Sequence, residues 1–147
     1  MTKVDLIIEA RWVCPVVPSH TLLSNHAVVI HSGKIVDVCP IAGTKQYQAN
    51  ETLQLRDQVL IPGLINLHTH AAMNLMRGLA DDVPLMPWLE QHIWPAEAKF
   101  VSPSFVKDGT LLACAEMLAG GITCFNDMYF YPVAAAEAAK KLVCALI

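Results

Sequence analysis

Apolar and polar residues follow two different patterns along this chain, and the change comes near residue 60. Before it, short apolar segments alternate with polar stretches, as is typical of strands; they occupy residues 4–8 and 12–17. Residues 26–38 predict two strands joined by a tight turn at Ser32-Gly33. Residues 40–57 are polar and irregular, so we expect a surface connection with room for one more short strand. This first part predicts a small all-β module.

From Val59 onward the apolar segments are longer. Residues 59–67 form a nearly continuous apolar run, which predicts a strand covered on both faces in a parallel sheet. The segment 71–102 follows, with only a short helix expected around 88–93, ended by Pro95. Loops of this length in compact domains are usually functional.

The remaining pattern alternates helices and strands. Ser102-Pro103 predicts the start of a helix that ends at Gly120-Gly121. A strand at 122–127, an alanine-rich helix at 133–141 and a third strand from 142 follow. This order predicts right-handed crossovers and a parallel sheet. An eight-stranded barrel needs about 250 residues, so we expect the start of a (β/α)8 barrel of the TIM type, truncated at Ile147 after about two and a half repeats.

Composition narrows the class of protein. The chain has 147 residues, 54% of them hydrophobic and 16% charged, with a net charge of -3, so it can bury a sizeable core. It has no cluster of Lys and Arg, which argues against nucleic acid or an anionic membrane as a partner. The five cysteines lack a Cys-x-x-Cys spacing, which indicates a reducing cytoplasm rather than a disulfide framework. No signal peptide and no apolar run of about 18 residues is recognisable, so we expect a cytoplasmic protein.

The sharpest chemical signal is the pair His68 and His70 at the end of the predicted first barrel strand. Alternate side chains of a strand share a face, so both imidazoles point the same way. In barrels of this type the functional groups sit at the carboxyl ends of the strands. A histidine pair with this spacing also occurs on ordinary surfaces; the strand-end position favours half of a metal site.

The run PGLINLHTH at residues 62–70 resembles the first-strand signature of the amidohydrolase superfamily, metal-dependent hydrolases in which a small β-sandwich flanks a barrel. Its continuation to Glu97, together with residues 116–129, is similar to the S-adenosylhomocysteine/5′-methylthioadenosine deaminase branch. The resemblance implies a β-sandwich portion at residues 1–60 and the N-terminal part of the barrel at residues 61–147. It also implies that the full-length protein hydrolyses the 6-amino group of an adenine nucleoside, giving the inosyl product and ammonia.

The resemblance assigns roles to four residues. His68 and His70 become ligands of one divalent metal ion, with zinc expected, and the other ligands would lie beyond Ile147. Such an ion lowers the pKa of bound water towards neutrality, which supplies the nucleophile. Glu97 becomes a substrate-binding carboxylate and Trp88 a wall of the nucleoside pocket, although taken alone they would be a solvated glutamate and a packing residue. No residue of this chain is assigned as a catalytic proton shuttle.

Several alternatives stay open from the sequence. Another amidohydrolase, a guanine-type deaminase or a triazine chlorohydrolase, would share the histidine pair. The chain could also be a non-catalytic truncated fragment, and we expect the 147-residue polypeptide alone to be inactive. Asp127 is expected to orient a neighbouring loop by a hydrogen bond rather than to bind metal. The expected partner is a small-molecule nucleoside, and the full-length protein is compatible with a homo-oligomer.

Overall fold

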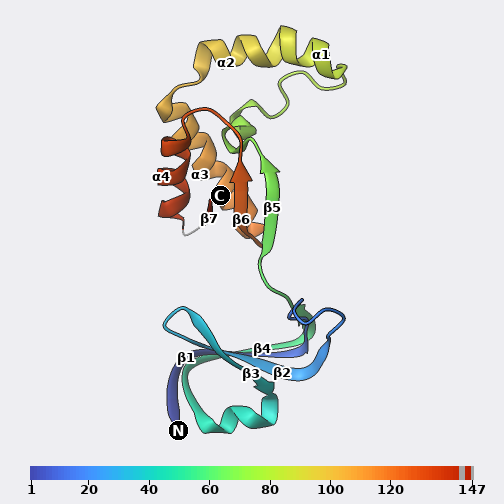
Figure 1. Cartoon of the computed structure of the whole chain (residues 1–147), viewed down its shortest axis with the longest axis vertical. Helices are drawn as coiled ribbons and strands as arrows, with labels where there is room; N and C mark the ends of the chain where they lie inside the picture. Colours follow the sequence, from blue (N-terminus) through green and yellow to red (C-terminus); the bar gives the residue numbers. More distant parts are fainter. Residues whose placement is uncertain (143–144, 147) are drawn as a thin grey trace. The chain divides into compact units, whose positions relative to one another are not determined.

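The computed structural model describes residues 1–142 and 145–146 of the chain, with side chains in 1–142. It divides into two compact units, residues 1–62 and 63–147, each of which is described by itself (Figure 1). The division falls inside the predicted strand at 59–67, because one strand ends at Leu60 and the next begins at Leu64. The prediction of one continuous strand across Pro62-Gly63 was therefore wrong.

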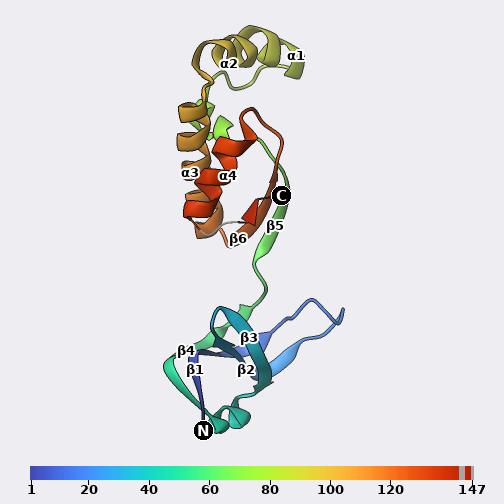
Figure 2. The same ribbon diagram turned by 60° about the vertical axis from the view of Figure 1, so that its left-hand side comes forward.

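The first unit is a four-stranded sheet in the order β3-β2-β1-β4 (Figure 2). Its strands are β1 (Thr2–Val13), β2 (Leu23–His31), β3 (Lys34–Pro40) and β4 (Tyr47–Leu60), with a 3₁₀ helix at Ile41–Gln46 before β4. The β2-β3 hairpin is confirmed: Ser32 and Gly33 have φ values of 51° and 71°, as a two-residue type I′ turn requires. The buried residues Val4, Ile7 and Val29 form the centre of its core.

The edge strand β4 is the main departure from the sequence prediction in this unit. Residues 40–57 were expected to be irregular, but they contribute most of a 14-residue strand that runs parallel to β1. Ten of the residues of β4 have partners in β1, from Tyr47 opposite Thr2 to Leu60 opposite Val13. Most of its side chains are exposed, so backbone pairing with β1 holds much of the strand, while Tyr47, Ala49, Leu55 and Leu60 pack against the core.

The second unit contains a parallel sheet in the order β5-β6-β7, as the alternation of strands and helices predicted. The strands are β5 (Leu64–Thr69), β6 (Ile122–Asp127) and β7 (Ala145–Leu146), and the helices α3 (Pro103–Ala119) and α4 (Pro132–Lys141) lie together on one side of the sheet (Figures 1 and 2). The predicted third strand at 142–147 is described only at 145–146. The other expected positions, 143, 144 and 147, lie outside the described residues.

Local signals set the ends of α3 as expected. The Ser102 hydroxyl accepts a hydrogen bond from the Phe105 amide at 3.2 Å, and Pro103 occupies the first turn. The helix ends at Gly120, and Gly121 follows with a φ of 81°. In the middle of α3, Gly109 lies against the loop that follows β5: an added Cβ would stand 2.6 Å from the carbonyl oxygen of Ala72.

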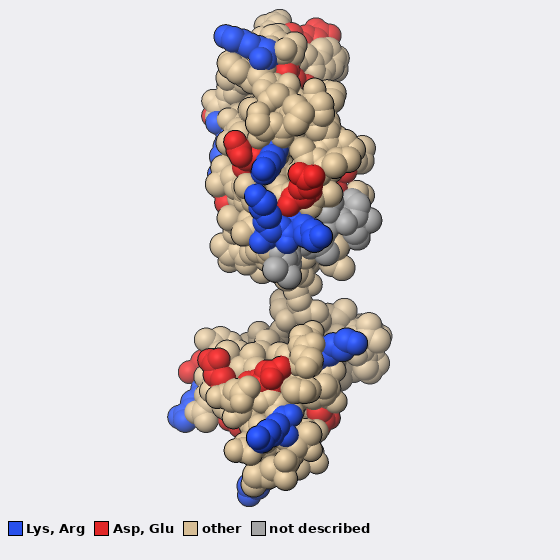
Figure 3. Space-filling model, turned by 90° about the vertical axis from the view of Figure 1, so that its left-hand side faces the viewer, with Lys and Arg blue, Asp and Glu red and all other residues tan. Residues whose placement is uncertain are grey.

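The expected coverage of the first barrel strand on both faces does not hold within the described residues. Ile65 is 61% exposed and Leu67 is 69% exposed, because no described element covers the side of β5 on which they lie. Phe125 in the neighbouring strand β6 is fully buried under the helices. Lys and Arg alternate with Asp and Glu over the face that carries these helices, with no extended patch of one sign (Figure 3).

Residues 85–100 form a nearly unbroken helical arm, where only a short helix was expected. It consists of α1 (Leu85–Trp88), a π-helical turn at Leu89–Ile93 and α2 (Trp94–Phe100). Pro95 does not end the helix as predicted. The preceding π-turn is wider than an α-turn, and the Trp94 amide already bonds to Leu89, so the missing N–H of Pro95 falls where the hydrogen-bond pattern changes. No helix among the described residues is long and apolar enough to span a membrane.

Candidate active site

His68 and His70 lie side by side at the carboxyl end of β5. Their ring centroids are 5.2 Å apart and the ring planes are nearly perpendicular, at 88°. Both side chains are exposed, so both rings are accessible to an ion. The shared orientation expected from the strand pattern is present, while the role of the pair as metal ligands stays a prediction.

A backbone hydrogen bond fixes the tautomer of His70. Its Nδ1 atom lies 2.6 Å from the carbonyl oxygen of Met128. A carbonyl oxygen only accepts, so Nδ1 carries the proton and donates. The lone pair of a neutral His70 is then on Nε2, the atom left for a metal ion, and a hydrogen bond from the other ring nitrogen to a backbone carbonyl group is typical of metal-binding histidines.

The donor set fits part of a metal site. Two accessible imidazoles, one with its free nitrogen already defined, suit a divalent ion of the zinc type. Structural and catalytic zinc sites use three or four protein ligands. Within residues 1–142, no group of three or more His, Cys, Asp or Glu side chains is arranged to hold a metal. Within the described residues, His68 and His70 are therefore two candidate ligands.

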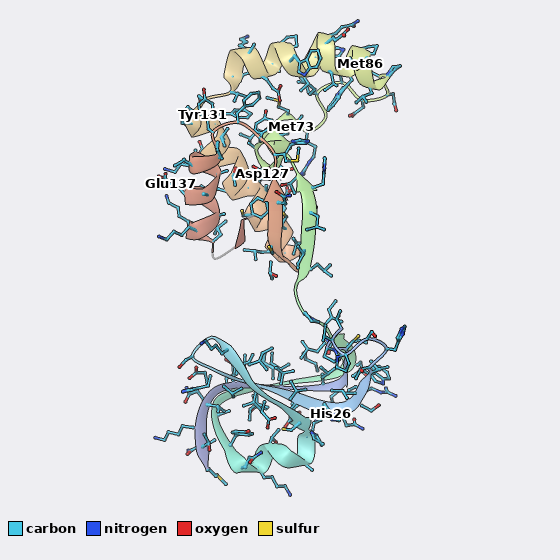
Figure 4. The ribbon with its side chains drawn as sticks, in the orientation of Figure 1. His26, Met73, Met86, Asp127, Tyr131 and Glu137 are labelled. Carbon is cyan, nitrogen blue, oxygen red and sulfur yellow. The ribbon has the colours of Figure 1, made fainter. Side chains whose placement is uncertain are left out.

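Asp127, at the end of β6, accepts hydrogen bonds from the residues on both sides of His70. Its Oδ1 atom accepts hydrogen bonds from the Thr69 hydroxyl at 3.0 Å and from the Ala71 amide at 2.7 Å. The Met128 amide also donates to the Thr69 carbonyl oxygen at 3.0 Å. These contacts agree with the loop-orienting role expected for Asp127. Figure 4 shows this residue at the end of β6, near Met73.

One cavity of about 690 Å³ joins three of the four predicted site residues. His70, Trp88 and Glu97 all line it, whereas His68 stands next to His70 outside the lining. The β5 end, the β6 end and the helical arm each contribute walls, and the lining is mainly apolar, with Met73, Leu89, Ile93 and Tyr129 among the others. A mainly apolar cavity with a few polar groups is the usual form of a small-molecule site.

The π-helical turn explains how Trp88 and Glu97 reach the same cavity. They are nine residues apart, and on a regular α-helix of about 100° per residue they would face opposite directions, about 180° apart. The π-turn at Leu89–Ile93 takes up one additional residue, or about 100°, and so reduces the angle between the two side chains to about 80°. π-turns of this kind are frequent at functional sites. The sequence pattern did not predict it.

Tyr129 is a site residue that the sequence analysis missed. Its hydroxyl donates a hydrogen bond to Glu97 Oε1 at 2.8 Å, and its ring centroid lies 6.2 Å from that of His70. Burial first, and then the hydrogen bond to the Glu97 carboxylate, raise the pKa of Tyr129, so its phenol stays protonated and remains a donor. The signal that could have found it was its place two residues beyond Asp127, just after the carboxyl end of a strand in the parallel sheet.

A polar cluster on the other side of the β5 loop ties this loop to α3. Both carboxylate oxygens of Glu116 accept hydrogen bonds from Arg77, at 3.1 and 2.5 Å, and the Asn74 side-chain amide donates to Glu116 at 2.9 Å. The hydrogen bonds from Arg77 hold the pKa of Glu116 below its usual value. Asn74 lies in the 3₁₀ helix at Ala71–Met76 and Arg77 directly follows it, so the cluster supports the segment after His70.

Because the folded-state pKa of Glu116 is depressed, its contribution to stability is present above the unfolded pKa, near 4.5, and is lost as the pH falls through the lower folded value. We therefore expect Glu116→Gln to destabilise the complete protein near neutral pH and to matter progressively less as the pH falls through the folded-state pKa of Glu116. Urea unfolding of both proteins across this range measures the difference. A difference between wild type and variant that does not shrink at all as the pH falls below 4.5 would contradict the assignment.

Comparison with known proteins identifies the family. The model of the amidohydrolase family matches residues 59–147, which is more than half of the chain. The chain belongs to the amidohydrolase family. This confirms the resemblance drawn from the 62–70 signature, and the mixed α/β architecture with its parallel sheet agrees with it.

Among the relatives of this amidohydrolase segment, the 5-methylthioadenosine/S-adenosylhomocysteine deaminase of Saccharophagus degradans is 56% identical over 139 residues, which cover 94% of this chain and 31% of the relative. The 5′-deoxyadenosine deaminase of Methanosarcina barkeri is 45% identical over 137 residues, covering 92% of this chain and 31% of that protein. The chain thus spans about a third of the length of the curated relatives it matches.

Two solved amidohydrolase structures match the same region. The adenosine deaminase of Xanthomonas campestris, with bound zinc, superimposes with a TM-score of 0.91 at 48% identity, covering 95% of this chain and 32% of that one. The atrazine chlorohydrolase of Arthrobacter aurescens, complexed with zinc, gives a TM-score of 0.81 at 25% identity, covering 96% of this chain and 34% of that one.

Proposed function

We propose that the complete protein carrying this sequence is a metal-dependent hydrolytic deaminase of adenine nucleosides of the 5′-methylthioadenosine and S-adenosylhomocysteine type. It converts the 6-amino group to the oxo group of the inosyl product and releases ammonia. The observation that carries the proposal is the single cavity shared by His70, whose Nε2 is free, and Glu97, whose carboxylate faces it from the helical arm. The names of the relatives and the zinc bound in similar solved structures support it.

In this proposal His68 and His70 hold one divalent ion, Zn²⁺, together with ligands from outside the described residues. When bound, such an ion lowers the pKa of water towards 7 and supplies the nucleophile for attack at C6 of adenine. Asp127 and the Met128 carbonyl group keep His70 in the required orientation through their hydrogen bonds. At the metal end of the cavity, these residues thus hold the His70 imidazole in one orientation.

At the sugar, Glu97 accepts hydrogen bonds from the paired hydroxyl groups of the ribose. A carboxylate has about four lone-pair sites, and the Tyr129 hydroxyl occupies one of them, which leaves sites on both oxygens for a diol. Trp88 contributes an apolar face to the same cavity, suited to a flat ring or an apolar substituent. The neighbouring Met73 and Leu89 side chains line the cavity and limit access of water.

The alternative functions within the family are a guanine-type deaminase and a triazine chlorohydrolase. Both rings lack a sugar diol, so the Glu97 carboxylate would have no hydroxyl pair to bind in the cavity. The position of Glu97 therefore favours a nucleoside substrate.

A substrate panel on the complete, metal-loaded protein tests the proposal. Ammonia release is measured with 5′-methylthioadenosine, S-adenosylhomocysteine, 5′-deoxyadenosine, adenosine and guanine, and chloride release with atrazine. We expect turnover with the adenine nucleosides alone. Ammonia release from guanine without activity on any adenine nucleoside, or turnover restricted to atrazine, would overturn the proposal.

Glu97→Gln is expected to weaken nucleoside binding and to leave metal binding intact. The amide replaces an ionised acceptor whose hydrogen bonds to hydroxyl groups are worth more than neutral ones, so KM should rise about 10- to 100-fold. Steady-state kinetics and elemental analysis of the same preparation separate the two effects. Glu90→Gln, on the same arm but outside the cavity lining, is the matched control. An unchanged KM, or loss of metal, would argue against this role for Glu97.

A further inference from the structure

We propose that Tyr129 is a positioning residue that gives the site its selectivity for a sugar with two neighbouring hydroxyl groups. It does so by holding the Glu97 carboxylate in one orientation with its hydroxyl group. The inference rests on the proposed nucleoside deaminase function and adds to it the residue that sets recognition of the sugar.

The contact itself is short and partly shielded from water. Tyr129 Oη donates to Glu97 Oε1 at 2.8 Å, and both side chains are half-buried. A glutamate on a helix has three rotatable side-chain bonds, and fixing them on substrate binding costs conformational entropy. A hydrogen bond that is present before the substrate arrives removes part of this cost.

Tyr129 can act in this way because its own position is set by the core of the second unit. Its ring packs against the buried cluster of Ala72, Val106 and Ala135, which joins the β5 loop, α3 and α4. It also makes an edge contact with Phe130, with 5.1 Å between the ring centroids. The hydroxyl group is therefore a fixed point of the barrel portion, and Glu97 is held to it from the helical arm.

The same ring connects the two ends of the cavity. One edge of Tyr129 approaches His70, with centroids 6.2 Å apart, while its hydroxyl group reaches Glu97. All three residues line the same 690 Å³ cavity. The spacing between the candidate metal ligand and the candidate sugar acceptor is thus set through one rigid side chain. A substrate must match this spacing to place its amino group and its diol together.

This geometry makes a selective prediction. Removing the hydroxyl group frees the Glu97 carboxylate, which weakens binding of a diol that needs both oxygens aligned. A sugar with one hydroxyl group depends less on this alignment, because a single hydrogen bond tolerates more rotation. Loss of the Tyr129 hydroxyl should therefore reduce the discrimination between the two kinds of sugar, and should do so without loss of metal.

The test uses the complete, metal-loaded protein with 5′-methylthioadenosine and its 2′-deoxy analogue. Tyr129→Phe is compared with Tyr131→Phe, a matched control because Tyr131 is 45% exposed and lies outside the cavity that holds His70. We expect Tyr129→Phe to raise KM for the diol substrate about tenfold and to change KM for the 2′-deoxy analogue less than threefold, with kcat and metal content preserved. Tyr131→Phe should match the wild type on both substrates.

A double-mutant cycle with Glu97→Gln adds an independent measurement. If Tyr129 acts through Glu97, the double variant should be no worse than Glu97→Gln alone. Should Tyr129→Phe fold poorly, Glu97→Asp moves the carboxylate away from the same hydroxyl group and should reduce the same discrimination.

Three results would overturn the inference. The first is unchanged discrimination between the two substrates in Tyr129→Phe, or in Glu97→Asp if that variant has to be used, and the second is additive losses in the double-mutant cycle. The third is an equal fall in kcat on both substrates together with loss of metal, which would place the effect at His70. A wild-type protein with no activity on any nucleoside would instead refute the proposed function, and this inference with it.

Discussion

Replacing His68 or His70 with alanine is expected to remove most of the bound metal and nearly all deaminase activity from the complete protein. The two rings lie 5.2 Å apart at one strand end, and each supplies a nitrogen to the same ion in the proposed site. Since that ion generates the nucleophile, we expect kcat/KM to fall by about 1,000-fold or more in either variant. Elemental analysis and steady-state kinetics on the same preparation measure both effects.

A matched histidine control is available in the other unit. His26 lies in β2, and its Nδ1 atom is 2.8 Å from the Ser24 carbonyl oxygen, a contact similar to that of His70 but far from it in the sequence. His26→Ala should keep full metal content and turnover. Wild-type metal content in both His68→Ala and His70→Ala would refute the ligand assignment.

The second large effect concerns the 147-residue polypeptide expressed by itself. We expect no measurable turnover and a strong tendency to self-associate. Two imidazoles are fewer than the three or four ligands of a zinc site, and no further group among the described residues completes one. Leu64, Ile65 and Leu67 of the edge strand are all at least 50% exposed, which leaves an apolar surface available for aggregation.

Analytical ultracentrifugation, binding of a hydrophobic dye and an ammonia assay test this expectation. A monodisperse 147-residue monomer that unfolds cooperatively and deaminates 5′-methylthioadenosine would show that the expectation is wrong.

Three separate segments of the chain supply the residues of the candidate site. The β5 end carries the histidines, the β6 end carries Asp127 and Tyr129, and the arm carries Trp88 and Glu97. The first two are held together by the hydrogen bonds of Asp127 to Thr69 and Ala71. The arm is tied to them by the hydrogen bond from Tyr129 to Glu97.

The sequence by itself determined the features whose causes lie within a few residues. The Ser102 cap, the stop at Gly120-Gly121 and the turn at Ser32-Gly33 each depend on one local hydrogen bond or one backbone conformation, and each was predicted. The family was also readable from the 62–70 signature, and it carried the assignment of Glu97 and Trp88 as candidates. The parallel order of β5 and β6 followed from the alternation of strands and helices.

Tertiary structure alone decided the features that join distant segments. The length of strand β4 depends on its pairing with β1, about 45 residues earlier, and its many polar residues gave only a weak signal of it. The π-turn that brings Trp88 and Glu97 to one cavity breaks the helical period on which sequence reasoning depends. The tautomer of His70 and the orientation of Glu97 are set by Met128 and Tyr129, which lie 58 and 32 residues away in the chain. Hydrogen bonds depend on distance and direction in space, and the order of residues does not record these until the chain has folded.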